Sequence, residues 1–199
     1  MFYEDRAHEG FIKALVERIV KEEAPNITIE FDVITGKRGS KILRDFYTFM
    51  KDVEKCVFRY DFIIVTIDGN CKGVQQKIRE LVRKIRKSNP YINKIVFAVP
   101  DPHIEKWYII DQNAFKSALR LSKAPALPQQ KCKRGYYKDI INHTIANEGF
   151  YTYLSAAEYA EDIIHNMSDI YYLCRMYSDF GSFVDTLRTM VKSSLRVVR

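Results

Sequence analysis

Three acidic residues, Glu4, Asp68 and Asp101, come at or just after the ends of short apolar segments. Asp68 follows an apolar, β-rich run over residues 62–67, and Asp101 comes shortly after a second run over 95–99. If these segments are parallel strands, their carboxyl ends line one edge of a sheet, where ligands bind. Gathered carboxylates repel one another unless a cation neutralises them, and such oxygen ligands suit Mg²⁺ or Mn²⁺. These ions activate water and stabilise both oxygens of a phosphoryl displacement.

Each acid also has a purely structural explanation, because Asp at a strand end often forms a turn or caps a helix. For any single acid we favour that explanation. For Glu4 and Asp68 together we favour a metal site, since ionisable groups that gather in a cleft are more often functional. The two carboxylates are then expected within about 4–6 Å of each other.

Residues next to these acids offer further ligands. Gly69 allows a tight turn after Asp68, and Asn70 supplies either an oxygen ligand or a cap for the following helix. Glu105 falls on the first turn of a later helix, where its charge suits the helix dipole. His103 is explained equally well by a solvated helix start and by proton transfer.

The expected elements that position these groups alternate between strand and helix. An alternating apolar pattern over 27–33 predicts a half-exposed strand near a sheet edge, whereas 62–68 and 95–99 read as strands buried on both faces. The other expected elements in this part are a strand over 1–4 and helices over 6–23, 41–56 and 73–87. The alternation predicts an α/β fold with a parallel sheet covered by helices.

The second half of the sequence reads as mainly helical. We expect a helix over 103–119 and then a loop over 121–135, which contains two prolines and a basic cluster. Further helices are expected near 136–146, 155–165, 168–177 and 180–195. The expected organisation is an α/β domain over 1–120, the loop over 121–135, and a helical extension over 136–199 packed on the same domain.

The formal net charge of +7 is compatible with a nucleic-acid partner, although solubility also requires net charge. Basic side chains crowd the helix over 73–87, where a solvated face explains them equally well. Basic clusters in the loops are better candidates for phosphate contact. The candidate nucleic-acid contacts are Lys37, Arg38, Lys72, Lys131, Lys133 and Arg134.

Cysteine spacing and hydropathy narrow the class further. The four cysteines are too far apart for a zinc knuckle, and we expect reduced thiols. The apolar runs are too short to cross a bilayer, and no signal peptide is recognised at the start. We therefore expect a cytoplasmic protein without membrane contact.

The order of these motifs resembles the Toprim fold of topoisomerases, bacterial primases and nucleases of the OLD type. The shared features are a glutamate after the first strand, an Asp-x-Asn after a later strand and a Glu-x-Trp at a helix start. The closer resemblance is to small stand-alone Toprim-like proteins that accompany ATPases in phage-defence loci. Matching stretches are 4–9, 66–70 and 101–111, so the resemblance covers about residues 1–111.

The resemblance implies a small Toprim-like sheet and a set of roles. Glu4 would be a metal ligand or a general acid or base, and Asp68 would bind the metal. Asn70 stands where the family has a second acid, which removes one negative charge, and Asp101 or Glu105 would replace it. The implied catalytic residues are Glu4, Asp68 and Glu105, and the implied ligands of Mg²⁺ or Mn²⁺ are Glu4, Asp68, Asn70 and Asp101.

The expected function is metal-dependent phosphodiester hydrolysis of DNA or RNA by a nuclease that acts as a defence effector. The alternative is a non-catalytic Toprim-like partner or sensor subunit that binds an ATPase or nucleic acid. Asn70 favours this alternative, because it weakens the expected metal site. An ATPase partner and a homo-oligomer both stay open at this point.

Overall fold

The structure is a computed structural model that describes residues 1–36, 41–56, 60–85, 89–127, 132–133, 135–149 and 151–197. Within these residues, short parallel strands form one sheet in the order β2-β1-β3-β4. The strands are β1 (Phe2–Tyr3), β2 (Ile34–Thr35), β3 (Ile63–Thr66) and β4 (Ile95–Ala98). The predicted α/β fold with a small parallel sheet flanked by helices is confirmed.

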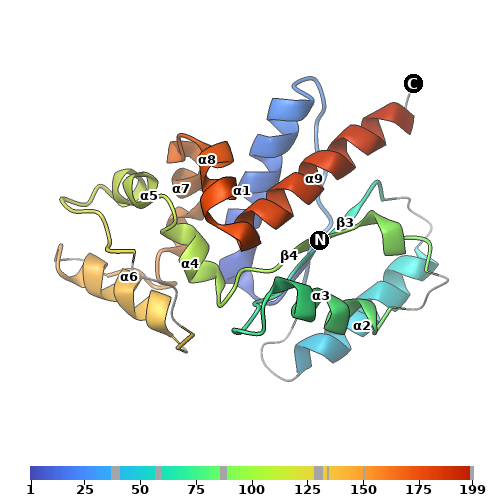
Figure 1. The fold of residues 1–199 in the computed structure, drawn as a ribbon, viewed down its shortest axis with the longest axis horizontal. Helices are drawn as coiled ribbons and strands as arrows, with labels where there is room; N and C mark the ends of the chain where they lie inside the picture. The colour runs from blue at the N-terminus through green and yellow to red at the C-terminus, as the bar shows by residue number, and fades with distance from the viewer. Residues whose placement is uncertain are drawn as a thin grey trace.

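Helices cover both faces of the sheet (Figure 1). Helices α1 (Arg6–Glu23) and α9 (Ser178–Val197) lie on one face, and α2 (Ile42–Lys55) and α3 (Val74–Val82) lie on the other. Side chains of β3 alternate between the two, so that Ile64 packs in the α1 cluster while Val65 packs in the α2 cluster. Burial on both faces explains why β3 is apolar from Ile63 to Val65.

Strand register brings the ends of β1 and β3 to one edge. Tyr3 of β1 lies opposite Thr66 of β3, and the Glu4 amide continues the ladder by donating to the Thr66 carbonyl oxygen at 3.0 Å. Asp68 then follows two residues beyond Thr66. Because neighbouring strands are parallel, Glu4 and Asp68 leave the sheet at the same carboxyl edge.

A group of shorter helices packs beside α1. They are α4 (Ile104–Tyr108), α5 (Gln112–Leu119), α6 (Tyr136–Ala146), α7 (Ala160–Asn166) and α8 (Ile170–Met176). Two 3-10 turns, η2 (Ile92–Lys94) and η3 (Ala157–Tyr159), complete the elements of the described chain. Trp107 of α4 is fully buried between Phe180 and Phe183 of α9. The C-terminal helices therefore share one apolar core with α1 and the sheet.

The strand predicted over 27–33 is wrong. These residues have no regular secondary structure, and the edge strand β2 starts at Ile34, whose amide donates to the Met1 carbonyl oxygen at 2.9 Å. Strand β1 is only two residues long, so it offers a partner for only two residues of β2. The alternating apolar pattern over 27–33 nevertheless reflects packing, because Phe31 and Val33 contact the core. The edge position is instead taken by β2, which follows this segment directly.

The single helix predicted over 103–119 is also wrong, because α4 ends at Tyr108 and α5 begins after Asp111. The Asp111 carboxylate accepts the Ala114 amide at 2.9 Å, which is an N-cap that starts a new helix. The segment predicted as one helix over 155–165 consists of η3 followed by α7. Within the described chain, no helix is both long and apolar enough to cross a membrane.

Candidate metal centre

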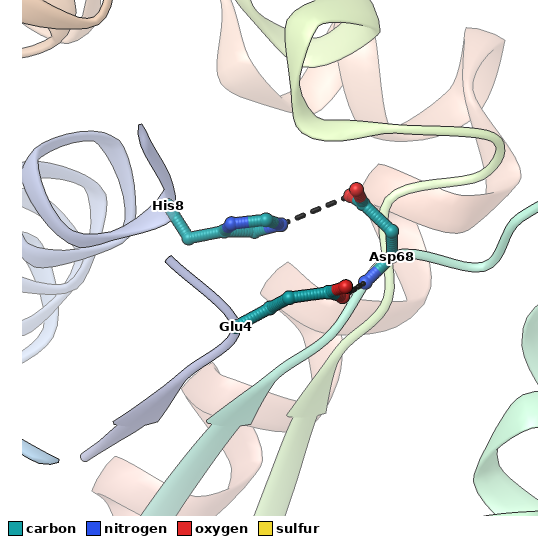
Figure 2. A group of neighbouring side chains, drawn as sticks. All are labelled: Glu4, His8 and Asp68. Carbon is teal, nitrogen blue, oxygen red and sulfur yellow. Dashed lines mark hydrogen bonds and ion pairs between the residues drawn. The ribbon is translucent and has the colours of Figure 1, made fainter. Parts of the chain in front are cut away.

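Glu4 and Asp68 meet directly at the carboxyl edge of the sheet (Figure 2). The Asp68 amide donates to Glu4 Oε2 at 3.0 Å, so the backbone after β3 fixes the carboxylate that follows β1. Both side chains are partly buried. The contact depends on β1 and β3 being neighbours, although 64 positions separate the two residues in the sequence.

His8 of α1 is the third member of the cluster, and sequence reasoning missed it. Asp5 caps α1 by accepting the Ala7 amide at 2.9 Å, and its Oδ1 also lies 2.9 Å from His8 Nδ1. The other ring nitrogen, Nε2, lies 2.9 Å from Asp68 Oδ1. His8 is fully buried, and Figure 2 shows its ring pointing from the first turn of α1 towards Asp68.

These three side chains form a group that fits a divalent cation. One ligand atom from each of Glu4, His8 and Asp68 lies within 4.8 Å of the others, and no other such group of His, Cys, Asp or Glu exists among the described residues. The predicted closeness of Glu4 and Asp68 is thereby confirmed. Two carboxylates and an imidazole are suitable donors for a transition-metal ion, and the carboxylates alone suit Mg²⁺.

The charges of the clustered side chains strongly affect one another's pKa values. Burial lowers the pKa of His8, but the charge of Asp68 and the contacts with Asp5 and Asp68 outweigh it and raise that pKa to about 10. Burial raises the pKa of Asp68, yet His8 and His103 hold it far below its ordinary value. Burial and the charge of Asp68 raise the pKa of Glu4. At neutral pH the His8 imidazolium therefore balances Asp68.

A second histidine closes the cluster on the side of α4. His103 Nδ1 lies 3.1 Å from Asp68 Oδ2, and the Ile104 amide donates to Asp68 Oδ1 at 3.0 Å. The hydrogen bond with Asp68 raises the pKa of His103 despite partial burial. The side chain of His103 is 19% exposed, whereas that of His8 is fully buried. His103 thus lies at the solvent side of the cluster.

Asp101 and Asn70 lie outside the cluster. Asp101 Oδ1 accepts the Cys71 amide at 2.8 Å, which ties the turn after β3 to the segment after β4. Gly69 packs so closely against Asp101 that an added Cβ would lie 2.5 Å from Oδ1. Asn70 is exposed with a φ of 52°, and its Nδ2 donates to the Asp68 carbonyl oxygen at 3.1 Å. Both side chains therefore form hydrogen bonds that stabilise this turn.

Asp179 of α9 supports the segment that follows β4. Its buried carboxylate accepts the Asp101 amide at 3.1 Å and the indole N–H of Trp107 at 2.8 Å. Lys106 Nζ lies 3.0 Å from Asp179 Oδ1 and also donates to the Asp101 carbonyl oxygen at 2.9 Å. This network holds the segment from Asp101 to Trp107, which includes His103, in a fixed position.

The remaining predicted site residues are placed as follows. Glu105 lies on the first turn of α4, close enough to raise the pKa of His103 but outside the group of three. Lys72 Nζ lies 3.1 Å from Glu80 Oε1, and Lys133 is exposed. The other four predicted nucleic-acid contacts fall outside the described residues: Lys37, Arg38, Lys131 and Arg134. A residue not predicted, the buried Lys77 of α3, lowers the pKa of Glu4 by its charge.

Comparison with family models, with curated proteins and with solved structures found no match. The Toprim resemblance therefore stays a prediction that rests on the residues alone. One signal in the sequence does point to His8. It is four residues after Glu4 and one helical turn before Phe11 and Ile12, so it is the polar residue on the apolar stripe of α1.

Proposed function

We propose that this protein is a divalent-metal-dependent phosphodiesterase that acts on nucleic acid. The observation that carries the proposal is the meeting of Glu4 and Asp68, with His8, at the carboxyl edge of a parallel sheet. Ligands of open α/β sheets bind at this edge. When bound, a divalent ion supplies an activated water molecule and charge stabilisation for phosphoryl displacement.

The side chains around the cluster have roles that follow from their contacts. Asp68 keeps its negative charge because its pKa is far below the ordinary value, so it is suited to hold a cation. Burial and the charge of Asp68 raise the pKa of Glu4, and a raised pKa suits a carboxyl group that accepts and returns a proton. The proposed nucleic-acid partner is supported by the net charge of +7 and by exposed Arg79, Arg83 and Lys84 near α3.

A second candidate function is a non-catalytic partner or sensor subunit that keeps this fold. The specific observation that favours it is the balance of charge at Asp68, where the His8 and His103 rings already contact both carboxylate oxygens. In addition, Asn70 and Asp101 contact the backbone of the turn. The negative charge of Asp68 is balanced without a cation, so the arrangement of these residues can be explained without a catalytic role.

The first test is metal-dependent cleavage. Purified protein is incubated with Mn²⁺ and with single-stranded and duplex DNA and RNA, and cleavage is followed on gels. We expect Glu4→Gln to lower the cleavage rate by about 100-fold or more, because it removes a carboxylate from the cluster without changing its shape. Glu161→Gln is the matched control, since Glu161 is exposed on α7. Glu105→Gln tests the predicted catalytic role of Glu105.

Two results would count against the proposal. Cleavage that persists undiminished in Glu4→Gln would come from a contaminant or from another site. Absence of cleavage on all four substrates, in protein shown to bind Mn²⁺, would favour the partner or sensor function instead.

A further inference from the structure

We propose that His8 is a direct nitrogen ligand of the bound ion, so that the site selects a transition-metal ion such as Mn²⁺ over Mg²⁺. This inference rests on the proposed metal-dependent function, since it concerns the ion at the same edge. It adds His8 to the acidic ligands predicted from the sequence, and it names the class of ion.

The first argument is the way in which Asp5 orients the ring. Histidine ligands of metals commonly donate the N–H of one ring nitrogen to a carboxylate, which fixes the tautomer and turns the other nitrogen to the metal. Asp5 Oδ1 lies 2.9 Å from His8 Nδ1, and the capping bond from the Ala7 amide holds Asp5 in place. The ring is therefore fixed with Nε2 on the side of Asp68 and Glu4.

The second argument is the spacing of the ligand atoms. His8 Nε2 lies 2.9 Å from Asp68 Oδ1. Two neighbouring ligands at right angles on one ion lie about 3.0 Å apart when the metal–ligand bonds are about 2.1 Å long. A carboxylate oxygen of Glu4 falls within the same 4.8 Å group. An ion bound by all three would replace the proton between His8 and Asp68 with only small side-chain movement.

The third argument is the position of His8 in the fold. The ring is fully buried on the apolar face of α1, in line with Phe11 and Ile12. A polar ring at this place is costly unless its nitrogens have partners, and here Nδ1 faces the Asp5 carboxylate while Nε2 faces that of Asp68. The apolar surroundings keep bulk water away from Nε2, which strengthens its interaction with a cation.

Ligand chemistry then decides the class of ion. Mg²⁺ is bound mostly through oxygen ligands and retains several waters, whereas imidazole suits the transition ions. One nitrogen and two carboxylates from the protein leave positions for water and for a phosphate oxygen. The resulting site resembles a catalytic transition-metal centre with open positions more than a magnesium site built from acids alone.

Pulsed electron paramagnetic resonance of the full-length protein loaded with Mn²⁺ tests the inference. We expect modulation from an imidazole ¹⁴N nucleus in the native protein, its loss in His8→Asp, and its retention in His103→Gln. We also expect the native protein to bind Mn²⁺ at least about tenfold more tightly than Mg²⁺, and His8→Asp to narrow that ratio. Asp5→Asn should keep the modulation but weaken Mn²⁺ binding by about 10–100-fold.

The outcomes separate this inference from the proposed function. Tight Mn²⁺ binding without ¹⁴N modulation in the native protein, or loss of the modulation in His103→Gln only, would overturn the role of His8 and leave the metal-dependent function standing. Absence of Mn²⁺ binding would overturn both the role of His8 and the metal-dependent function. Modulation from His8 in a protein that cleaves no substrate would support the role of His8 as a metal ligand and contradict the proposed nuclease activity. If His8→Asp does not fold, the native and His103→Gln spectra together decide the main point, because modulation that survives in His103→Gln does not come from His103.

Discussion

Asp68 is the residue on which the carboxyl edge depends. Its carboxylate contacts His8 and His103 through different oxygens and accepts the Ile104 amide, while its own amide donates to Glu4. Segments after β1, β3 and β4 are thereby joined through one side chain. A change at Asp68 would consequently disturb the fold of the edge as well as any chemistry there, whereas Glu4→Gln alters fewer contacts.

The coupling between His8 and Asp68 predicts a pH dependence of stability in protein kept free of metal with chelator. Folding raises the pKa of His8 from 6.5 to about 10, so its contribution to stability is complete below pH 6.5 and is lost as the pH rises towards 10. The pKa of Asp68 is lowered, so its contribution is present above about pH 4 and is lost on acidification. Urea denaturation at several pH values measures both.

His8→Gln isolates the histidine contribution, because other groups also titrate between pH 6.5 and 10. The loss of unfolding free energy over this interval should be smaller in His8→Gln than in the native protein. His165→Gln, at an exposed position on α7, should follow the native curve. Parallel curves for the native protein and His8→Gln would show that His8 does not carry a bound proton in the folded state.

Part of this site was predictable from single residues and part was not. Glu4 and Asp68 could be predicted because the carboxyl ends of parallel strands share one edge. The position of Asp101 depends on a hydrogen bond between two turns, from the Cys71 amide, and that of Asn70 on a bond within its own turn, to the Asp68 carbonyl oxygen. Turn contacts of this kind leave no periodic pattern in the sequence, so residue type alone did not separate ligands from turn formers.

At the scale of elements, α8 and α9 meet at a point without space for a side chain. A Cβ added to Gly181 of α9 would lie 2.4 Å from the Cys174 carbonyl oxygen of α8. Backbone cannot move aside as a flexible side chain does. We expect Gly181→Ala to lower the free energy of unfolding by about 1–3 kcal/mol, measured by urea denaturation.

Gly10 provides the matched control, since it is also a glycine within a helix. A Cβ at Gly10 of α1 would meet Ala160 Cβ at 3.5 Å, which is ordinary van der Waals contact. Gly10→Ala should therefore stabilise the protein by about 0.5–1 kcal/mol through helix propensity. If both substitutions stabilise equally, the close approach of α8 and α9 described here is incorrect.

Long helices and the buried strands could be predicted from the apolar pattern, but some short elements could not. The apolar stripe of α1 predicts its bounds, because one face is buried along its whole length. The break at Asp111 that separates α4 from α5 is a local capping signal, which the apolar pattern over 103–119 obscured. Strand β2 depends on the length of its partner β1, and that length is a tertiary property.

At the scale of the whole molecule, binding of a cation at the edge should stabilise the native state by mass action. Free Mn²⁺ at about 100 times its dissociation constant adds about 2.7 kcal/mol, which corresponds to roughly 5–10 °C in the melting temperature of a chain of this length. Calorimetry of chelator-treated protein, with and without added Mn²⁺, measures the shift.

Glu4→Gln should reduce this shift, whereas Glu161→Gln should retain it, because only the former removes a carboxylate from the cluster. An unchanged melting temperature in saturating millimolar Mn²⁺ would contradict the metal centre. An equal shift in both variants would show that the cation binds at a different place on the molecule.

The order β2-β1-β3-β4 places the first strand in the interior of the sheet, which has a consequence for folding kinetics. Strand β1 cannot complete its pairing until β3 has been synthesised, and the contacts of Glu4 with Asp68 and of Asp101 with Asp179 span 64 and 78 positions. Contacts between residues so far apart in the sequence slow folding, because long loops must close before these contacts stabilise anything. During translation, the apolar face of α1 therefore stays without its final partner until α9 emerges from the ribosome.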